Sequence, residues 1–104
     1  MVVEIKGLVK LLHENKIKNV SVYDLTSSNE EKFIVLSTAN KATDSKKVAD
    51  VVASKYGYDD KIEGYFKGEW IVFDFPKLTL HIFLPKVRDK YNLDKLYKPK
   101  KISI

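Results

Sequence analysis

The 104-residue chain contains no cysteine, so disulfide bonds and thiolate metal sites are excluded and a reducing compartment is the natural setting. No stretch approaches the roughly 20 consecutive apolar residues that a membrane-spanning helix needs. Glu4 and Lys6 interrupt the first apolar residues, which therefore do not resemble a secretory signal. The sequence predicts a cytoplasmic protein with no membrane partner.

The chain also has little that could support catalysis. His13 and His81 are its two histidines, and they do not have the spacing of a metal-binding pair. The four glycines form no phosphate-binding loop, and no nucleophile elbow is present. His81 and Asp74 could form an acid–base pair, but the simpler interpretation is a strand histidine bonded to a neighbour. We therefore expect no enzyme, no metal and no cofactor.

What the sequence does contain is an ordinary apolar fraction of 44% and a net charge of +5. That composition suits one compact domain with a modest core. The basic residues are 18 lysines and one arginine, Arg88. Lysine reads bases poorly compared with arginine, so direct sequence-specific recognition of nucleic acid is not expected. The charge fits either a general attraction to an acidic partner such as a ribonucleoprotein, or a solvated lysine surface.

Apolar periodicity predicts two helices. The first covers residues 3–15. The second begins near Asn40 or Thr43, either of which could be its N-cap, and ends at Gly57. Asp59 and Asp60 mark a loop. Strands are predicted at 20–25, 33–36, 62–66, 69–75 and 78–84, followed by a helical turn at 87–90. A crossover would join 33–36 to 62–66 if these two strands run parallel. The order predicts an α/β fold with a mixed sheet of about five strands and helices packed on one face, formed by residues 1–97, with a lysine-rich tail at 98–104.

The register of the hairpin at 69–84 can be worked out from its turn. Pro76 cannot adopt positive φ, which disfavours a two-residue primed turn, so we expect a loop over 75–78. The expected cross-strand pairs are then Asp74–Thr79, Val72–His81 and Trp70–Phe83. Paired side chains share a face of the sheet. One face is wholly apolar and must be the core side: Ile71, Phe73, Phe75, Leu78, Leu80 and Ile82.

The other hairpin face mixes aromatic and polar side chains: Trp70, Val72, Asp74, Thr79, His81 and Phe83. If helices cover only the core side, this face is open to water. Exposed aromatic residues beside polar groups are typical of interaction surfaces. The alternative is that the C-terminal segment or a loop folds over this face and buries it.

The hairpin also carries a resemblance to a known family. Glu63-Gly64, Gly68 to Asp74 and His81-Ile82-Phe83, followed by Arg88, Tyr91, Leu93 and Leu96, closely resemble the ribosomal silencing factor family, also called Iojap-like or RsfS. Asp24, Phe33-Ile34-Val35 and Val48-Ala49-Asp50 extend the resemblance over nearly the whole chain.

The resemblance implies an α/β fold similar to nucleotidyltransferases, without enzyme activity. It also implies a translational repressor that binds the large ribosomal subunit at its protein number fourteen, blocks joining of the small subunit and lowers translation under nutrient limitation. Trp70 is the expected anchor, with Asp74, His81 and Phe83 beside it. Tyr91 and Leu96 either extend this surface or pack it. The free protein could also pair as a homodimer through the same surface.

The chain departs from the family pattern at several loops. Thr38-Ala39-Asn40-Lys41 replaces the usual Thr-Gly-Thr-Ser, and Pro76 replaces a glycine in the hairpin turn. Lys90 stands where an aromatic or apolar residue is usual, Tyr97 replaces a tryptophan, and the lysines of 98–101 are not a general family feature. Two other functions stay open: a basic RNA-binding module and a residual nucleotidyltransferase, although the chain lacks the latter's Gly-Ser loop and paired aspartates.

Overall fold

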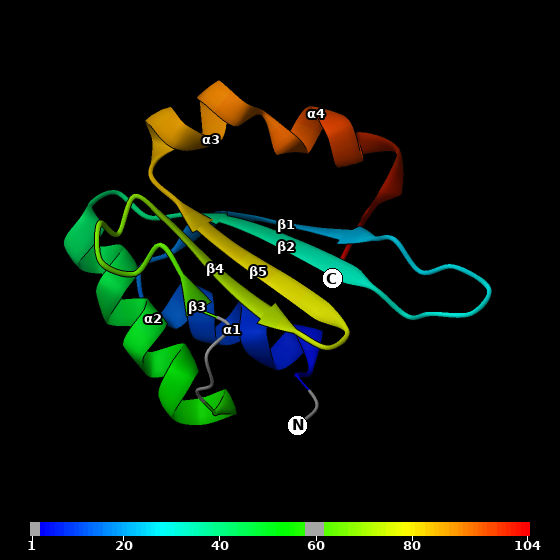
Figure 1. Cartoon of the computed structure of the whole chain (residues 1–104), viewed down its shortest axis with the longest axis horizontal. Helices are drawn as coiled ribbons and strands as arrows, with labels where there is room; N and C mark the ends of the chain where they lie inside the picture. Colours follow the sequence, from blue (N-terminus) through cyan, green and yellow to red (C-terminus); the bar gives the residue numbers. More distant parts are fainter. Residues whose placement is uncertain (1–2, 58–61) are drawn as a thin grey trace.

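The computed structural model, which describes residues 3–57 and 62–104, is an α/β structure with three layers. A mixed sheet lies in the middle, with α1 and α2 below it and α3 and α4 above it in the view of Figure 1. The described strands follow the order β3-β4-β5-β2-β1-β6. Their bounds are β1 Lys18–Asp24, β2 Phe33–Thr38, β3 Ile62–Glu63, β4 Trp70–Phe75, β5 Leu78–Phe83 and β6 Lys101–Ile102. The loop predicted at Asp59 and Asp60 lies outside the described residues.

The lower layer forms as the apolar periodicity predicts. Helix α1 (Ile5–Glu14) and helix α2 (Ala42–Tyr56) pack against one face of the sheet, and Leu8, Leu12, Val48 and Val52 are fully buried. Burying one such side chain contributes about 1.5–3 kcal/mol relative to leaving it exposed. The apolar face of the hairpin meets these helices, so the main core lies where the sequence placed it.

The capping prediction for α2 was wrong at its start and correct at its end. Lys41, in an extended conformation, occupies the N-cap and makes no side-chain capping bond, so neither Asn40 nor Thr43 serves as the cap. At the other end Gly57 adopts a φ of 90°, and its N–H donates to the carbonyl of Ala53. A residue without a Cβ adopts positive φ without strain.

The crossover prediction was also wrong, because the parallel partner of β2 is β5 and not β3. Strand β3 has two residues and lies at the sheet edge, antiparallel to β4. A strand inside the sheet must bury side chains on both faces along its length. Strand β5 does this with Leu80 and Ile82 on one face and Phe83 on the other, whereas β3 is too short.

The second face of the sheet is covered as well, which the expectation of helices on one face did not include. Helices α3 (Pro85–Tyr91) and α4 (Leu93–Tyr97) run across it in succession, joined at Asn92 with a φ of 45° (Figure 1). The segment expected as a tail continues as a 3₁₀ helix and then pairs as β6 with β1. Ile102 packs against the main core, so residues 98–102 belong to the fold.

Candidate partner-binding surface

The hairpin of β4 and β5 has the predicted register. Trp70 pairs with Phe83, Val72 with His81 and Asp74 with Thr79. The pairing continues to Phe75 and Leu78, which flank the tip residues Pro76 and Lys77. Neither tip residue has positive φ. The turn is therefore not a primed one, as the proline requires. The mixed side chains consequently share the face that carries α3 and α4.

Trp70 is the centre of an aromatic cluster on this face. Its ring centroid lies 4.9 Å from that of Tyr91 and 5.2 Å from that of Phe83, in tilted arrangements typical of aromatic pairs. The Trp70 Nε1–H donates to Nδ1 of His81 at 3.0 Å. Trp70 is half-buried, so part of the indole remains accessible with its orientation fixed on three sides.

Phe83 does not have the exposure that the sequence analysis expected. Only 1% of it is accessible, because it joins Tyr23, Ile34 and Leu36 in a second core cluster under the upper helices. Val87 of α3 packs against the same cluster. Phe83 therefore supports Trp70 from below and cannot itself touch a partner in this structure. The alternative that the C-terminal segment covers the mixed face is therefore correct at the Phe83 end of the hairpin.

His81 is half-buried, and its surroundings favour the neutral imidazole. Burial lowers the pKa of His81 from 6.5 to about 4. The bond from Trp70 independently requires a lone pair on Nδ1, which places the ring proton on Nε2. Asp74 takes other partners: Thr79 Oγ1 donates to it at 3.4 Å, and Lys32 Nζ lies 4.0 Å away. The acid–base pair of His81 with Asp74 is therefore not formed.

Tyr91 and Leu96 are the exposed members of the predicted site. Tyr91 ends α3 and is 52% exposed, with the Lys90 ammonium 5.5 Å from its ring centroid. Leu96 lies in α4 and is 67% exposed. We call Trp70, His81 and Tyr91 the aromatic patch. Leu96 belongs to α4, the helix that follows α3 in the upper layer (Figure 1). Asp74 lies near the other end of β4, two positions before the tip residue Pro76.

An ion pair that the sequence analysis did not single out holds the upper layer in place. Arg88 Nε and Nη2 donate to the two carboxylate oxygens of Asp94 at 2.9 and 2.8 Å. The hydroxyl of Tyr23 in β1 donates to the same carboxylate at 2.7 Å, and Arg88 Nη1 donates to Thr38 Oγ1 at 2.9 Å. The bonds from Arg88 lower the pKa of Asp94. Helices α3 and α4 are thus tied to two strands, which fixes Tyr91 over Trp70.

The loop that leads into Trp70 presents another aromatic residue that the sequence analysis missed. Gly64 has a φ of 79°, and a Cβ there would lie 1.9 Å from the carbonyl oxygen of Trp70. The Gly68 N–H donates to the carbonyl of Gly64 at 3.0 Å and closes the loop. Between these two glycines, Phe66 is 90% exposed, with Lys46 Nζ 5.8 Å from its ring centroid. The sequence signal that could have indicated this exposed ring is the pair Gly64 and Gly68, which lie on either side of Phe66 and favour a turn.

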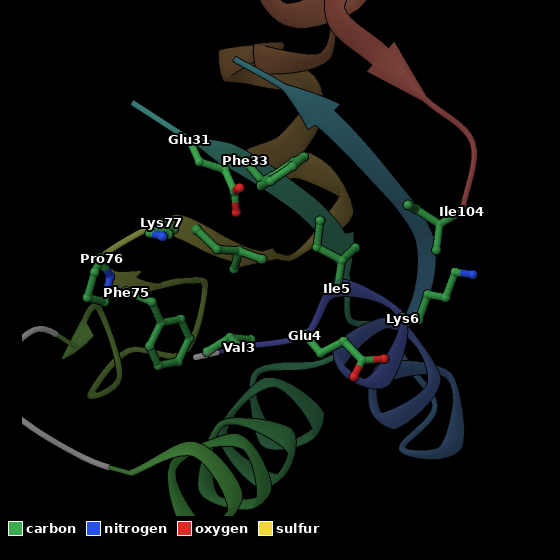
Figure 2. A pocket seen from close by; sticks show the side chains of 11 residues that line it. Val3, Glu4, Ile5, Lys6, Glu31, Phe33, Phe75, Pro76, Lys77 and Ile104 are labelled. Atoms are coloured by element: carbon green, nitrogen blue, oxygen red, sulfur yellow. The ribbon is translucent and has the colours of Figure 1, made fainter. Parts of the chain in front are cut away.

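A hollow formed by described residues lies away from the aromatic patch. It is a groove of about 580 Å³ at the far end of the hairpin, between the hairpin tip, the start of α1 and the end of the chain. Figure 2 shows Phe75, Pro76 and Lys77 on one side of it and Lys6 and Ile104 on the other, with Glu31 and Phe33 above and Val3 and Glu4 below. None of the predicted site residues lines it.

Residues 3–57 and 62–104 offer neither a metal site nor a membrane span. No group of three or more histidine, cysteine, aspartate or glutamate side chains is placed to hold a metal ion. None of the helices in this part of the chain combines the length and the apolar character needed to cross a membrane.

Comparison with known proteins connects this structure to one family. A family model described as "Ribosomal silencing factor during starvation" (RsfS) matches residues 3–103. A ribosomal silencing factor RsfS of Zymomonas mobilis is 36% identical over 53 residues, which are 51% of this chain and 40% of that protein. The RsfS of Chromobacterium violaceum is 39% identical over 41 residues, 39% of this chain and 34% of that protein. The matched segments thus span less than half of these relatives.

Solved structures agree with the fold. A crystal structure of a protein from Chromobacterium violaceum superposes with a TM-score of 0.76 at 26% identity, covering 98% of this chain and 92% of that one. A protein from Bacillus halodurans gives a TM-score of 0.76 at 22% identity, covers 96% of each chain and supports the fold alone. Because the family model matches almost the full length, the chain belongs to the RsfS family of ribosomal silencing factors.

Proposed function

We propose that this protein is a cytoplasmic ribosomal silencing factor that binds the large ribosomal subunit at its protein number fourteen and acts without catalysis. Family membership is the observation that carries this proposal. A mouse relative, 40% identical over 37 residues, which are 36% of this chain and 16% of that protein, is named mitochondrial assembly of ribosomal large subunit protein 1. The names of these relatives therefore refer to the ribosome and, in the case of the mouse protein, to the large subunit.

The aromatic patch is the part of the molecule we propose for the contact with the ribosomal protein. Tryptophan and tyrosine dominate binding hot spots, because they bury much area and lose little conformational freedom. The rings of Trp70 and Tyr91 are already packed against each other at 4.9 Å, so binding would cost little further ordering. In the proposed site, the buried ring of Phe83 supports Trp70 without touching the partner, and Leu96 and Asp74 lie outside the aromatic patch.

The proposed mechanism is steric exclusion. The described body measures 38 × 30 × 24 Å, which is far larger than any gap between two surfaces in direct contact. A body of this size bound on the intersubunit face of the large subunit would prevent the small subunit from joining. Translation would then fall in proportion to the fraction of large subunits that carry the protein, which suits a response to nutrient limitation.

Co-sedimentation with isolated large subunits tests the proposal. Tyr91→Ala is the sharper variant, because Tyr91 is 52% exposed and its truncation should leave the fold intact. Loss of a hot spot costs about 2 kcal/mol or more, or roughly 30-fold in Kd. Tyr65→Ala is the matched control, since Tyr65 is 40% exposed and its hydroxyl bonds to Asp50 of α2 in the lower layer. Trp70→Ala should weaken binding at least as much.

Equal binding by wild type and both patch variants would show that the aromatic patch is the wrong surface. Absence of binding by the wild type would reject the proposed function itself. The same patch could pair two copies of the free protein. Analytical ultracentrifugation of wild type and Tyr91→Ala tests that pairing. A dimer that persists in the variant would show that the dimer interface lies outside the aromatic patch.

A further inference from the structure

The excess positive charge of this chain is confined to its C-terminal fifth. Residues 85–104 contain seven basic and two acidic side chains, whereas residues 1–84 contain twelve of each. The net charge of +5 therefore belongs entirely to the segment that forms the upper layer and β6. A solvated lysine surface that serves only solubility would not need this asymmetry.

Four lysines of this segment are held on a fixed scaffold and point to solvent. Lys95 lies in α4, Lys98 and Lys100 lie in the 3₁₀ helix, and Lys101 begins β6, and all four are exposed. Tyr97 anchors the segment, with its ring centroid 5.8 Å from that of Tyr23. We call these four lysines the lysine edge.

The lysine edge has no internal partner within 4 Å among the described side chains. The ion pairs found in residues 3–57 and 62–104 are Lys32–Asp74 and Arg88–Asp94, so Asp94 is already engaged. The pKa of Asp24 is lowered mainly by hydrogen bonds from Thr26 and also by the charge of Lys100. Four exposed cations on consecutive elements, none within 4 Å of a carboxylate among the described side chains, favour a polyanionic ligand.

We propose that the lysine edge binds the phosphate backbone of ribosomal RNA on the large subunit, beside the protein contact made by the aromatic patch. This proposal rests on the proposed function for the location of that RNA. Lysine is a point charge that binds phosphate without reading bases, and the edge offers no aromatic side chain for stacking except the packed Tyr97. The contact would therefore position the protein without recognising sequence.

The salt dependence of binding gives the expected magnitude. Each phosphate neutralised on single-stranded nucleic acid contributes about 0.7 to the slope of log K against log salt concentration. Four lysines on four phosphates would contribute about 3 to that slope. Replacing all four by glutamine should therefore flatten the slope by about 3, and should weaken binding far more at 50 mM salt than at 200 mM.

The experiment compares two variants with the same change in net charge. One carries Lys95→Gln, Lys98→Gln, Lys100→Gln and Lys101→Gln. The control carries Lys6→Gln, Lys10→Gln, Lys47→Gln and Lys55→Gln, four exposed positions on the helices of the lower layer. Binding to large subunits and to protein-free large-subunit RNA is measured across a salt titration. A flatter slope for the lysine-edge variant alone supports the proposal, and equal slopes for the two variants overturn it.

The measurement on protein-free RNA distinguishes failure of this proposal from failure of the proposed function. If intact subunits fail to bind the protein, a difference in salt slope between the two variants on protein-free RNA would still support the RNA contact. Conversely, Tyr91→Ala should weaken binding to subunits at every salt concentration without changing the slope. A photo-crosslinking amino acid at position 98 identifies the neighbour on the subunit. Attachment to RNA supports the proposal, and attachment to ribosomal protein alone overturns it in favour of an acidic protein surface.

Discussion

Lowering the pH from 7.5 to 5.0 should destabilise this protein through one residue, His81. Burial lowers the pKa of His81 to about 4 from an ordinary value of 6.5, so the native state holds the imidazole neutral while the unfolded state does not. The Nδ1 lone pair also accepts the hydrogen bond from Trp70, and a proton on that atom would break it. Stability is therefore complete above pH 6.5 and declines as the pH falls toward 4.

The magnitude follows from the two pKa values. Each pH unit between them costs at most about 1.4 kcal/mol, because the unfolded state binds up to one more proton than the native state. Between pH 7.5 and 5.0 the loss in free energy of unfolding is about 2 kcal/mol. That is a large part of the 5–15 kcal/mol typical of a small domain. Asp94, whose pKa is lowered by Arg88, contributes its own loss only below its ordinary value of 3.8.

Urea denaturation at several pH values measures this effect directly. Trp70 is the single tryptophan and packs against His81, so its fluorescence reports both unfolding and the state of that contact. An NMR titration of the His81 ring gives the native pKa independently. The quantity to compare is the dependence of the free energy of unfolding on pH, with the denaturant slope checked for constancy.

His81→Gln is the control, because glutamine can accept the bond from Trp70 but does not titrate. Whatever its absolute stability, this variant should lose the pH dependence between 4 and 6.5. If wild type and His81→Gln decline in parallel, or if the His81 ring titrates near 6.5 in the native state, the assignment of this dependence to a neutral, half-buried imidazole is refuted.

Three further substitutions test how the surface is built. Asp94→Asn should lower the free energy of unfolding by about 2 kcal/mol, because it removes the charge partner of the largely buried Arg88; a change within 0.5 kcal/mol in urea denaturation would contradict this role. Gly64→Ala should lower the free energy of unfolding by about 2 kcal/mol or more, since φ is positive and a Cβ would meet a backbone carbonyl. In Gly7→Ala, within α1, the new Cβ meets only a hydroxyl at 3.5 Å, so this variant should be neutral or stabilising. Phe66→Ala should change stability by less than about 0.5 kcal/mol because its ring is 90% exposed, and a larger loss measured by thermal unfolding would show that the ring packs in solution.

The hairpin shows how far local rules reach. Pro76 restricts the turn, the turn sets the register, and strict alternation then assigns each side chain to a face. All three steps depend on residues within 15 positions of one another, and the structure confirms the predicted pairs. The two helices of the lower layer were predictable for a similar reason, because their apolar stripes are continuous in the sequence.

The upper layer was not predictable by the same means. Helices α3 and α4 have seven and five residues, too short for a clear periodic signal, and neither contains a buried residue. They are held by contacts between segments far apart in sequence, such as Arg88 with Thr38 and Asp94 with Tyr23. For this reason the burial of Phe83 and the packing of Tyr91 against Trp70 could not be inferred from the hairpin alone.

The sequence by itself determined the α/β class, the main core, the hairpin register and the family resemblance, because each of these depends on composition, short-range periodicity or local turn chemistry. Only the tertiary structure decided which aromatic residues of the mixed face stay accessible and that the lysine segment is an ordered edge. Those outcomes depend on bonds from Arg88 to Thr38 and from Tyr23 to Asp94, which span 50 and 71 positions, and on the pairing of the two-residue strand β6 with β1. Contacts between such distant segments leave no local pattern in the sequence.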